Sequence, residues 1–281
     1  MKSESTHAER PSRAGRNLPA AIGVGVSLAL MVVASLFFVK DAFVLVVVVA
    51  LGIGMAEITR AFKTAEIQIP LIPVLTGGSA MLVGAFYGGV ETAAVAMALT
   101  VIGTLIWRLS DGADGFVRDS SAGIFVLSYL PLMGVFVMLM LSESDGEWRI
   151  VAFIVATVAS DVGGYAAGAL LGKHPMAPTI SPKKSWEGFA GSMTVGMIAG
   201  VLTVTYALDG RWWVGLILGA VGVIMATLGD LSESLIKRDI GIKDMGDLLP
   251  GHGGLMDRLD SLIAVAPFAW VVLHYLVPVT K

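Results

Sequence analysis

A dense group of charged and polar residues lies between positions 230 and 260, flanked by long hydrophobic runs. It contains the carboxylates of Asp230 and Asp257 and the basic side chains of Lys237 and Arg238. Carboxylate oxygens suit a hard cation such as Mg²⁺, whereas lysine and arginine suit phosphate oxygens. Because charges near lipid are costly, their concentration in a hydrophobic chain indicates a functional site. The composition of this group predicts phosphate chemistry at a membrane surface.

Helical spacing would bring part of this group onto one face. If the preceding helix continues past Gly229, then Asp230, either Glu233 or Ser234, and Lys237 recur along one side. An acid, a hydroxyl and a cation would then form a single stripe. The same pattern also fits an ordinary charged helix end at the membrane interface.

A glycine-rich loop follows, with the sequence Pro-Gly-His-Gly-Gly at 250–254. The backbone N–H groups around His252 are unhindered and can approach a phosphate, although such a loop is also typical of a flexible turn. The last helix then begins with Asp257 and Asp260 at positions i and i+3. This spacing places both carboxylates on one face at a helix N-terminus, where they could share a cation.

Two upstream features also carry charge. Asp161 lies inside a hydrophobic run, where a carboxylate facing lipid would cost on the order of 3 kcal/mol. We favour a metal or substrate partner for it over a hydrogen bond or ion pair between helices. Lys183 and Lys184 are adjacent and could bind a triphosphate. Alternatively they anchor the membrane interface, with Ser185 capping a helix and Trp186 lying at the interface.

Composition places the chain among membrane proteins. It has 281 residues, a mean hydropathy of +0.81 and 15% charged residues, against about 25% in soluble domains. It has no cysteine, which excludes disulfides and thiolate-bound metals, so a metal would need oxygen ligands or one of 4 histidines. The net charge of −3 gives no indication of nucleic-acid binding, and we expect no nucleic-acid partner.

Hydrophobic runs predict an all-α, polytopic membrane protein with about nine transmembrane helices. The predicted spans are 18–39, 41–62, 68–87, 90–109, 120–141, 148–171, 187–208, 212–236 and 259–279. We divide the chain into a disordered cytoplasmic tail (1–17), N-terminal transmembrane helices (18–141) and a C-terminal transmembrane catalytic region (142–281).

The basic residues predict the orientation. With the N-terminus in the cytoplasm, only four of the 19 basic residues fall outside, namely Lys40, Arg149, Arg211 and Lys281. The polar loops 172–186 and 230–258 then share the cytoplasmic face. Two distant basic segments can therefore converge on one site that cytosolic nucleotides reach.

The order of residues from Ser234 to Asp260 resembles the signature of the phosphatidate cytidylyltransferases, or CDP-diacylglycerol synthases. The matching positions are Ser234, Lys237, Arg238, Lys243, Asp244, Pro250, His252, Gly253, Gly254, Asp257, Arg258 and Asp260. Ser160-Asp161, Gly172-Lys173 and the segment 180–188 resemble other parts of the family pattern, so the resemblance covers about residues 155–265. The chain departs from it at Val162-Gly-Gly-Tyr165, where the family commonly has Thr-Gly-Ala-Tyr.

The resemblance implies conversion of CTP and phosphatidate to CDP-diacylglycerol and pyrophosphate, with Mg²⁺ and a possible second cation. The implied catalytic residues are Asp230, Lys237, Arg238, Asp257 and Asp260, and the implied metal ligands are Asp161, Asp230, Asp257 and Asp260. The implied contacts to CTP and phosphates are Lys173, Ser181, Lys183, Lys184, Glu187, Ser234, Lys243, His252, Gly253, Gly254 and Arg258. It further implies a homodimer. A site on the cytoplasmic face would draw phosphatidic acid from the inner leaflet, and a compact chain without a transit peptide indicates a bacterial plasma membrane.

Other functions fit parts of the pattern. A CTP-dependent cytidylyltransferase or kinase could share the nucleotide site and act on another membrane lipid. A CDP-alcohol phosphotransferase is disfavoured because Asp111-Gly-Ala-Asp-Gly lacks the Ala-Arg of that motif. An ion-coupled transporter would use Asp161, but its polar residues would lie near the midplane, often in two related halves. We expect Glu57 to be solvated at a helix end and the charged loop 108–119 to form a turn.

Overall fold

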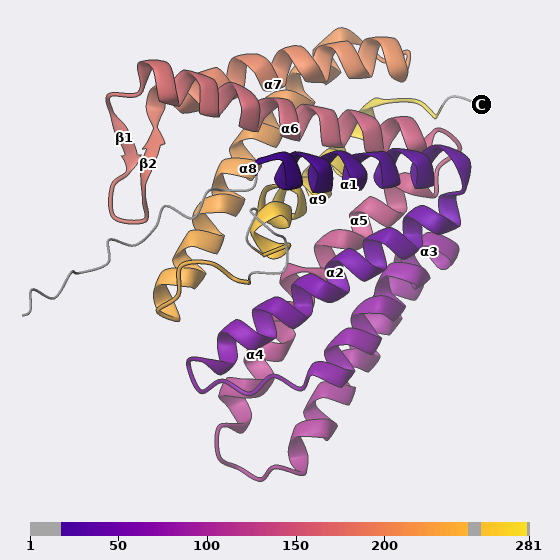
Figure 1. Cartoon of the computed structure of the whole chain (residues 1–281). Coiled ribbons are helices and arrows are strands. Elements are labelled where there is room, and N and C mark those ends of the chain that lie inside the picture. Colours follow the sequence, from indigo (N-terminus) through magenta and orange to yellow (C-terminus); the bar gives the residue numbers. More distant parts are fainter. Residues whose placement is uncertain (1–17, 247–253, 280–281) are drawn as a thin grey trace, which may run out of the picture.

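The computed structural model describes residues 18–246 and 254–279, which are almost entirely helical (Figure 1). The helices are α1 (Leu18–Phe38), α2 (Lys40–Lys63), α3 (Leu71–Leu109), α4 (Phe116–Tyr129), α5 (Pro131–Leu141), α6 (Gly146–Leu171), α7 (Trp186–Ala207), α8 (Trp212–Asp239) and α9 (Met256–Leu276). Strands β1 (Pro175–Ala177) and β2 (Ser181–Ser185) form an antiparallel hairpin between α6 and α7. The predicted division at residue 141 is not tested by this arrangement, and the predicted tail lies outside the described residues.

The all-α polytopic class is confirmed. Seven helical segments among the described residues are long and apolar enough to cross a membrane, and α4 with α5 counts as one of them. The predicted count of nine is not confirmed, for two reasons. The predicted spans 68–87 and 90–109 correspond to the two arms of the single element α3, which begins at Leu71. The described apolar part of α1, Gly25–Phe38, is shorter than a full span.

α3 is broken at Gly89, where the backbone leaves the helical region with φ +69° and ψ −161°. A side chain is disfavoured at this positive φ, and glycine adopts it without strain. The two arms then run back along each other, because Gly77 lies against the Thr100 side chain and Gly84 against Thr92. The sequence places this break correctly at the Gly88–Gly89 connection.

Glycines allow α7 and α8 to pack backbone to backbone. A Cβ atom at Gly219 would lie 2.5 Å from the carbonyl oxygen of Gly196, and Gly215 is equally close to Gly200. Small residues at such contacts let helices approach closely in lipid. At the far end of α8, a Cβ at Gly229 would lie 2.7 Å from the carbonyl oxygen of Asp260. The close approach of α8 to α9 brings the charged residues of both helices together.

Buried arginines hold the helix ends. Arg149 donates to the carboxylate of Asp145 and to the carbonyl oxygens of Leu273 and Val277, at the C-terminal end of α9. The last carbonyls of a helix lack N–H partners from a following turn. The guanidinium satisfies that of Val277 and adds a second donor to that of Leu273, which also accepts the N–H of Val277. At the other end of the molecule, Arg108 of α3 forms a buried ion pair with Asp119 of α4. The charged loop at 108–119 therefore forms the expected turn and is also closed by a buried ion pair.

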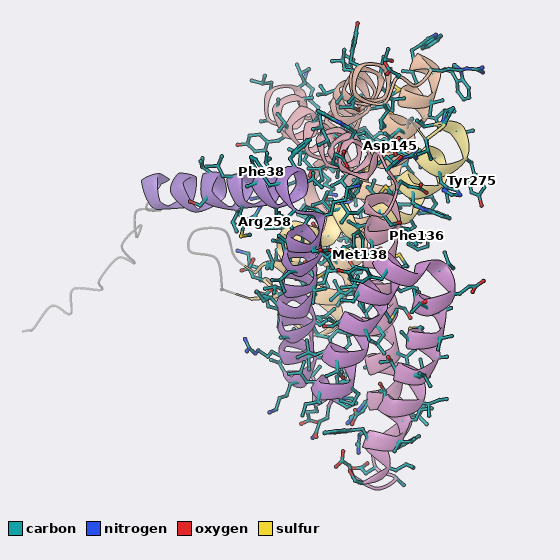
Figure 2. The ribbon with its side chains drawn as sticks, turned by 90° about the vertical axis from the view of Figure 1, so that its right-hand side faces the viewer. Phe38, Phe136, Met138, Asp145, Arg258 and Tyr275 are labelled. Atoms are coloured by element: carbon teal, nitrogen blue, oxygen red, sulfur yellow. The ribbon has the colours of Figure 1, made fainter. Side chains whose placement is uncertain are left out.

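Elements of the predicted cytoplasmic face lie at one end of the molecule. Figure 1 shows the β1–β2 hairpin, the C-terminal ends of α2 and α8 and the α3–α4 connection on its left and lower side, with the α1–α2 and α5–α6 connections opposite. Figure 2 shows α1 extending away from the other helices, with Phe38 where α1 meets α2. The two polar loops predicted to converge thus share an end of the fold.

Candidate active site

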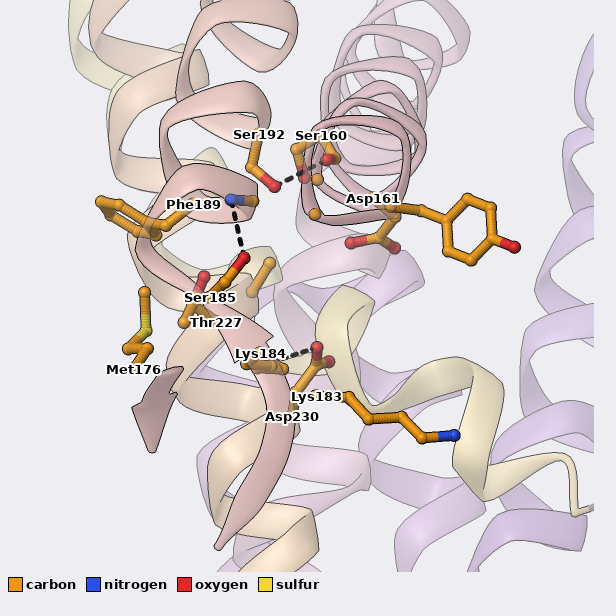
Figure 3. Close-up of a pocket in the computed structure, with 15 residues that line it drawn as sticks. Ser160, Asp161, Met176, Lys183, Lys184, Ser185, Phe189, Ser192, Thr227 and Asp230 are labelled. Atoms are coloured by element: carbon orange, nitrogen blue, oxygen red, sulfur yellow. Dashed lines mark hydrogen bonds and ion pairs between the residues drawn. The ribbon is translucent and has the colours of Figure 1, made fainter. Parts of the chain in front are cut away.

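A cavity of about 320 Å³ lies between α6, the β1–β2 hairpin, α7 and α8 (Figure 3). Asp161, Lys183, Lys184 and Asp230 are the charged residues that line it. Each belongs to the set predicted from the sequence. The cavity therefore joins the upstream segments of the pattern to the charged end of α8.

Asp230 lies at the junction of three elements. Lys184 of β2 donates to its Oδ2 atom, and Ser261 of α9 donates to its Oδ1 atom. The Lys184 and Asp230 side chains are 25% and 29% exposed, so the ion pair is partly shielded from water and is stronger than a pair on an open surface. The contact confirms that the two predicted cytoplasmic segments converge.

Asp161 projects into the same space from α6. Figure 3 shows its carboxylate and that of Asp230 directed into the cavity. Asp161 has no hydrogen bond or ion pair with another described residue, but it lies close enough to Asp230 and Lys184 to interact electrostatically with both. The structure therefore shows no hydrogen bond or ion pair from Asp161 to another helix in the described part of the chain, and its role as a metal or substrate ligand stays a prediction.

A second charged cluster surrounds Asp257 at the start of α9. Lys237 donates to Asp257 and to Glu233, at 2.9 Å in each case. Asp257 also accepts the backbone N–H groups of Met245 and Gly254. The helical stripe predicted on α8 is present, and Glu233 rather than Ser234 forms its middle contact. Glu233 is 2% exposed, and its Oε1 atom has no hydrogen-bond partner among the described residues.

Carboxylates outnumber the cations that contact them. Asp260 lies beside Asp230 and Glu233, and all three are near the buried hydroxyl of Tyr129, which has no hydrogen-bond partner among the described residues. Oxygen ligands in excess of local lysines fit a divalent cation such as Mg²⁺. No group of three or more His, Asp or Glu side chains in the described part of the chain is close enough to hold an ion. Asp230 lies near both Asp161 and Asp260, and a single ion shared by all four predicted ligands stays a prediction.

Four basic residues of the predicted site have exposed side chains. Among the described residues, these side chains form no ion pair: Lys173, Lys183, Arg238 and Lys243. Arg258 is also exposed, at the start of α9 (Figure 2). Of these residues only Lys183 lines the cavity, and exposed cations attract polyanionic ligands.

The remaining predicted residues differ in their surroundings. Glu187 accepts the backbone N–H groups of Lys173 and His174 and contacts the His174 ring, so it closes the base of the hairpin. Ser185 caps α7 through the N–H of Gly188, as predicted. Ser181 and Ser234 are half-buried. His252 and Gly253 lie outside the described residues, so their predicted contacts stay predictions.

Sequence reasoning missed Glu57 of α2. Its side chain is buried, and its carboxylate accepts the backbone N–H groups of Leu255 and Met256. The expectation that Glu57 is solvated was wrong. A signal was available, because Glu57 interrupts a hydrophobic helix in the same way as Asp161, and the same cost argument applies to both.

Comparison with known proteins agrees with this geometry. A profile of the Cytidylyltransferase family matches residues 19–276. The phosphatidate cytidylyltransferase of Mycobacterium bovis is 44% identical over 96% of this chain and 92% of its own length. Those of Mycobacterium leprae and Helicobacter pylori strain 26695 are 43% and 32% identical, over 94% and 88% of this chain and 90% and 89% of their own lengths.

The chain therefore belongs to the cytidylyltransferase family and is a nucleotidyltransferase. The predicted family is confirmed. The match also extends over the N-terminal helices, beyond the region of about 155–265 in which the sequence pattern was recognised.

Proposed function

We propose that this protein is a CTP:phosphatidate cytidylyltransferase that makes CDP-diacylglycerol. The observation that carries the proposal is the Lys184–Asp230 contact, which joins two distant segments of the family pattern beside a cavity. The names of the relatives, similar over nearly the whole chain, support phosphatidate as the lipid substrate.

In the proposed reaction, a phosphate oxygen of phosphatidate forms a bond to the α-phosphorus of CTP. The bond from that phosphorus to the oxygen of the β-phosphate breaks, and pyrophosphate leaves. The lipid phosphate is already ionised at neutral pH, so the nucleophile needs no strong general base. The chemical difficulty is to bring two anions together and to stabilise the leaving charge.

The basic side chains of the site meet this requirement. Lys184 and Lys237 lie within the two carboxylate clusters, where they hold Asp230 and Asp257 in place. Lys183 lines the cavity and would bind the triphosphate together with the exposed Lys173 and Lys243. Positioning and charge neutralisation of this kind account for most of the rate enhancement in phosphoryl transfer.

We further propose that Asp161, Asp230, Asp257 and Asp260 hold Mg²⁺, with a second cation as part of the same site. The excess of carboxylates over lysines supports this assignment. When bound, the ion would supply neutralisation of the phosphate charge. The protein's own residues would position the two substrates and exclude water from the cavity.

The finer topology is also a proposal. We propose nine crossings with the N-terminus in the cytoplasm, in a bacterial plasma membrane, with phosphatidate entering from the inner leaflet and the enzyme acting as a homodimer. Because the chain has no cysteine, single cysteines at Ser110 and Ser144 can report sidedness in intact cells. An impermeant maleimide should label Ser144→Cys and leave Ser110→Cys unlabelled, and the reverse pattern would contradict the orientation.

The reaction is tested by incubating the purified protein with radiolabelled CTP, phosphatidate and Mg²⁺ in detergent. The wild type should form labelled CDP-diacylglycerol, Asp257→Asn should lose nearly all activity, and Asp209→Asn on the opposite end should retain it. Product formed only with another phospholipid acid or alcohol would move the assignment to another lipid cytidylyltransferase or kinase. No use of CTP with any lipid would overturn the proposal in favour of transport.

A further inference from the structure

Glu57 is a buried carboxylate from the N-terminal half that contacts the catalytic half directly. It lies on α2 between Met55 and Ile58, and its side chain is 4% exposed. Its oxygens accept the N–H of Leu255 at 3.1 Å and of Met256 at 2.8 Å. It forms no ion pair with any lysine or arginine among the described residues. A buried carboxylate in a membrane protein needs a compensating partner, and the backbone N–H groups at the start of α9 provide it.

The N-terminus of α9 lacks a cap from its own segment. Leu255 precedes the helix and provides no side-chain hydrogen bond. The first N–H groups of a helix have no partner within it and carry partial positive charge, so a carboxylate there is stabilising. Glu57 provides this cap from a position 198 residues earlier in the chain.

The same turn positions the catalytic carboxylate. Asp257 follows the two capped residues directly and accepts N–H groups of Met245 and Gly254. A Cβ atom at Gly254 would lie 2.9 Å from Asp257 Oδ2 and 3.0 Å from Glu57 Oε2, so Gly254 fits between the two carboxylates. A Cβ at Gly246 would lie 2.6 Å from Glu57 Oε1. Glu57 and Asp257 therefore hold one tight turn from its two sides.

We propose that Glu57 is a positioning residue for the nucleotidyl transfer: it fixes the N-terminus of α9, and through it the orientation of Asp257 toward Lys237. This inference rests on the proposed function for the identity of the reaction, whereas the contact between Glu57 and α9 does not depend on it. Both oxygens of Glu57 are engaged by backbone N–H groups, so it acts through the turn and does not act as a base. The helices without a sequence signature thus contribute to the catalytic geometry.

The test compares Glu57→Gln with Glu57→Asp and with the control Glu91→Gln, which removes an exposed carboxylate elsewhere, on α3. Amide hydrogen exchange of full-length protein in detergent is measured for residues 254–258, and turnover of CTP with phosphatidate is measured per folded molecule. We expect Glu57→Gln to exchange faster at 254–258 alone and to lose about 100-fold in kcat, as a displaced catalytic group does. Glu57→Asp should fall between, and Glu91→Gln should match the wild type.

Each result bears on the proposal. Unchanged exchange with lower kcat would overturn it, because Glu57 would then act directly on substrate or metal. Faster exchange with unchanged kcat would also overturn it, because the cap would serve stability alone. If Glu57→Gln does not fold, the amide exchange at 254–258 and the kcat of Glu57→Asp test the proposal in the same way. A wild type that turns over no CTP would refute the proposed function, whereas the exchange measurement would still test the cap.

Discussion

Lys184 and Asp230 are 46 positions apart in the sequence, and their side chains form an ion pair that joins β2 to the charged end of α8. Asp230 is held from its other side by Ser261 of α9. The Asp230 carboxylate therefore connects three elements, β2, α8 and α9, that are separated in the sequence. Its orientation depends on Lys184, which lines the cavity with it.

Replacing Lys184 by methionine removes the cation but keeps an extended side chain of similar length. We expect kcat to fall about 100-fold, because a positioned charge at a phosphoryl-transfer site is typically worth that much. Activity is measured with radiolabelled CTP. Lys63→Met at the exposed end of α2 is the matched control and should keep wild-type activity. Equal activity in both variants would show that Lys184 has no part in the reaction.

The buried pair of Arg108 and Asp119 should contribute to stability and not to turnover. Asp119 is fully buried and accepts two hydrogen bonds from Arg108. Asp119→Asn would remove the buried counter-charge of the Arg108 guanidinium and leave only its contact with the exposed Asp111, at a cost of about 3 kcal/mol. Thermal unfolding in detergent should show a lower Tm, with normal activity in the fraction that remains folded. Asp111→Asn removes the other, exposed partner of Arg108; because the Asp111 side chain is 57% exposed, this change should lower Tm little.

The convergence of the two polar loops could be predicted from the sequence. Hydrophobic runs locate the helices, and the distribution of basic residues places 172–186 and 230–258 on the same face. The contact between Lys184 and Asp230 agrees with this. The break at Gly89 and the cap at Ser185 were also predictable, because both depend on neighbouring residues alone.

The contacts of Glu57 and Tyr129 could not be predicted in the same way. Glu57 binds backbone N–H groups of α9, and backbone groups carry no residue-specific signal in the sequence. The Tyr129 hydroxyl, at the C-terminal end of α4, comes near carboxylates on α8 and α9 only through the tertiary fold. The number of membrane crossings could not be predicted for another reason. A broken helix such as α3 is a single helical element, but its two arms run in different directions on either side of Gly89.

The glycine contact between α7 and α8 should be sensitive to a single methyl group. A Cβ at Gly219 would lie 2.5 Å from the carbonyl oxygen of Gly196. Gly219→Ala should therefore force the helices apart and destabilise the protein by about 1–3 kcal/mol, measured as a lower Tm. Gly103→Ala is the control, because nothing lies within 4 Å of a Cβ there, and it should leave Tm unchanged or raise it. Equal effects would mean that the helices separate at no cost.

The carboxylates around the cavity should make activity dependent on a divalent cation. Chelation with EDTA should abolish CDP-diacylglycerol formation, and added Mg²⁺ should restore it. Asp161 has no partner among the described residues, so its replacement by Asn should remove a ligand and not a structural contact. Asp161→Asn should need at least about tenfold more Mg²⁺ for half-maximal activity, as loss of metal-site groups typically does, with Tm unchanged. Asp41→Asn, on the first turn of α2 at the opposite end, should keep the wild-type requirement. Full activity of the EDTA-treated enzyme would contradict the metal site.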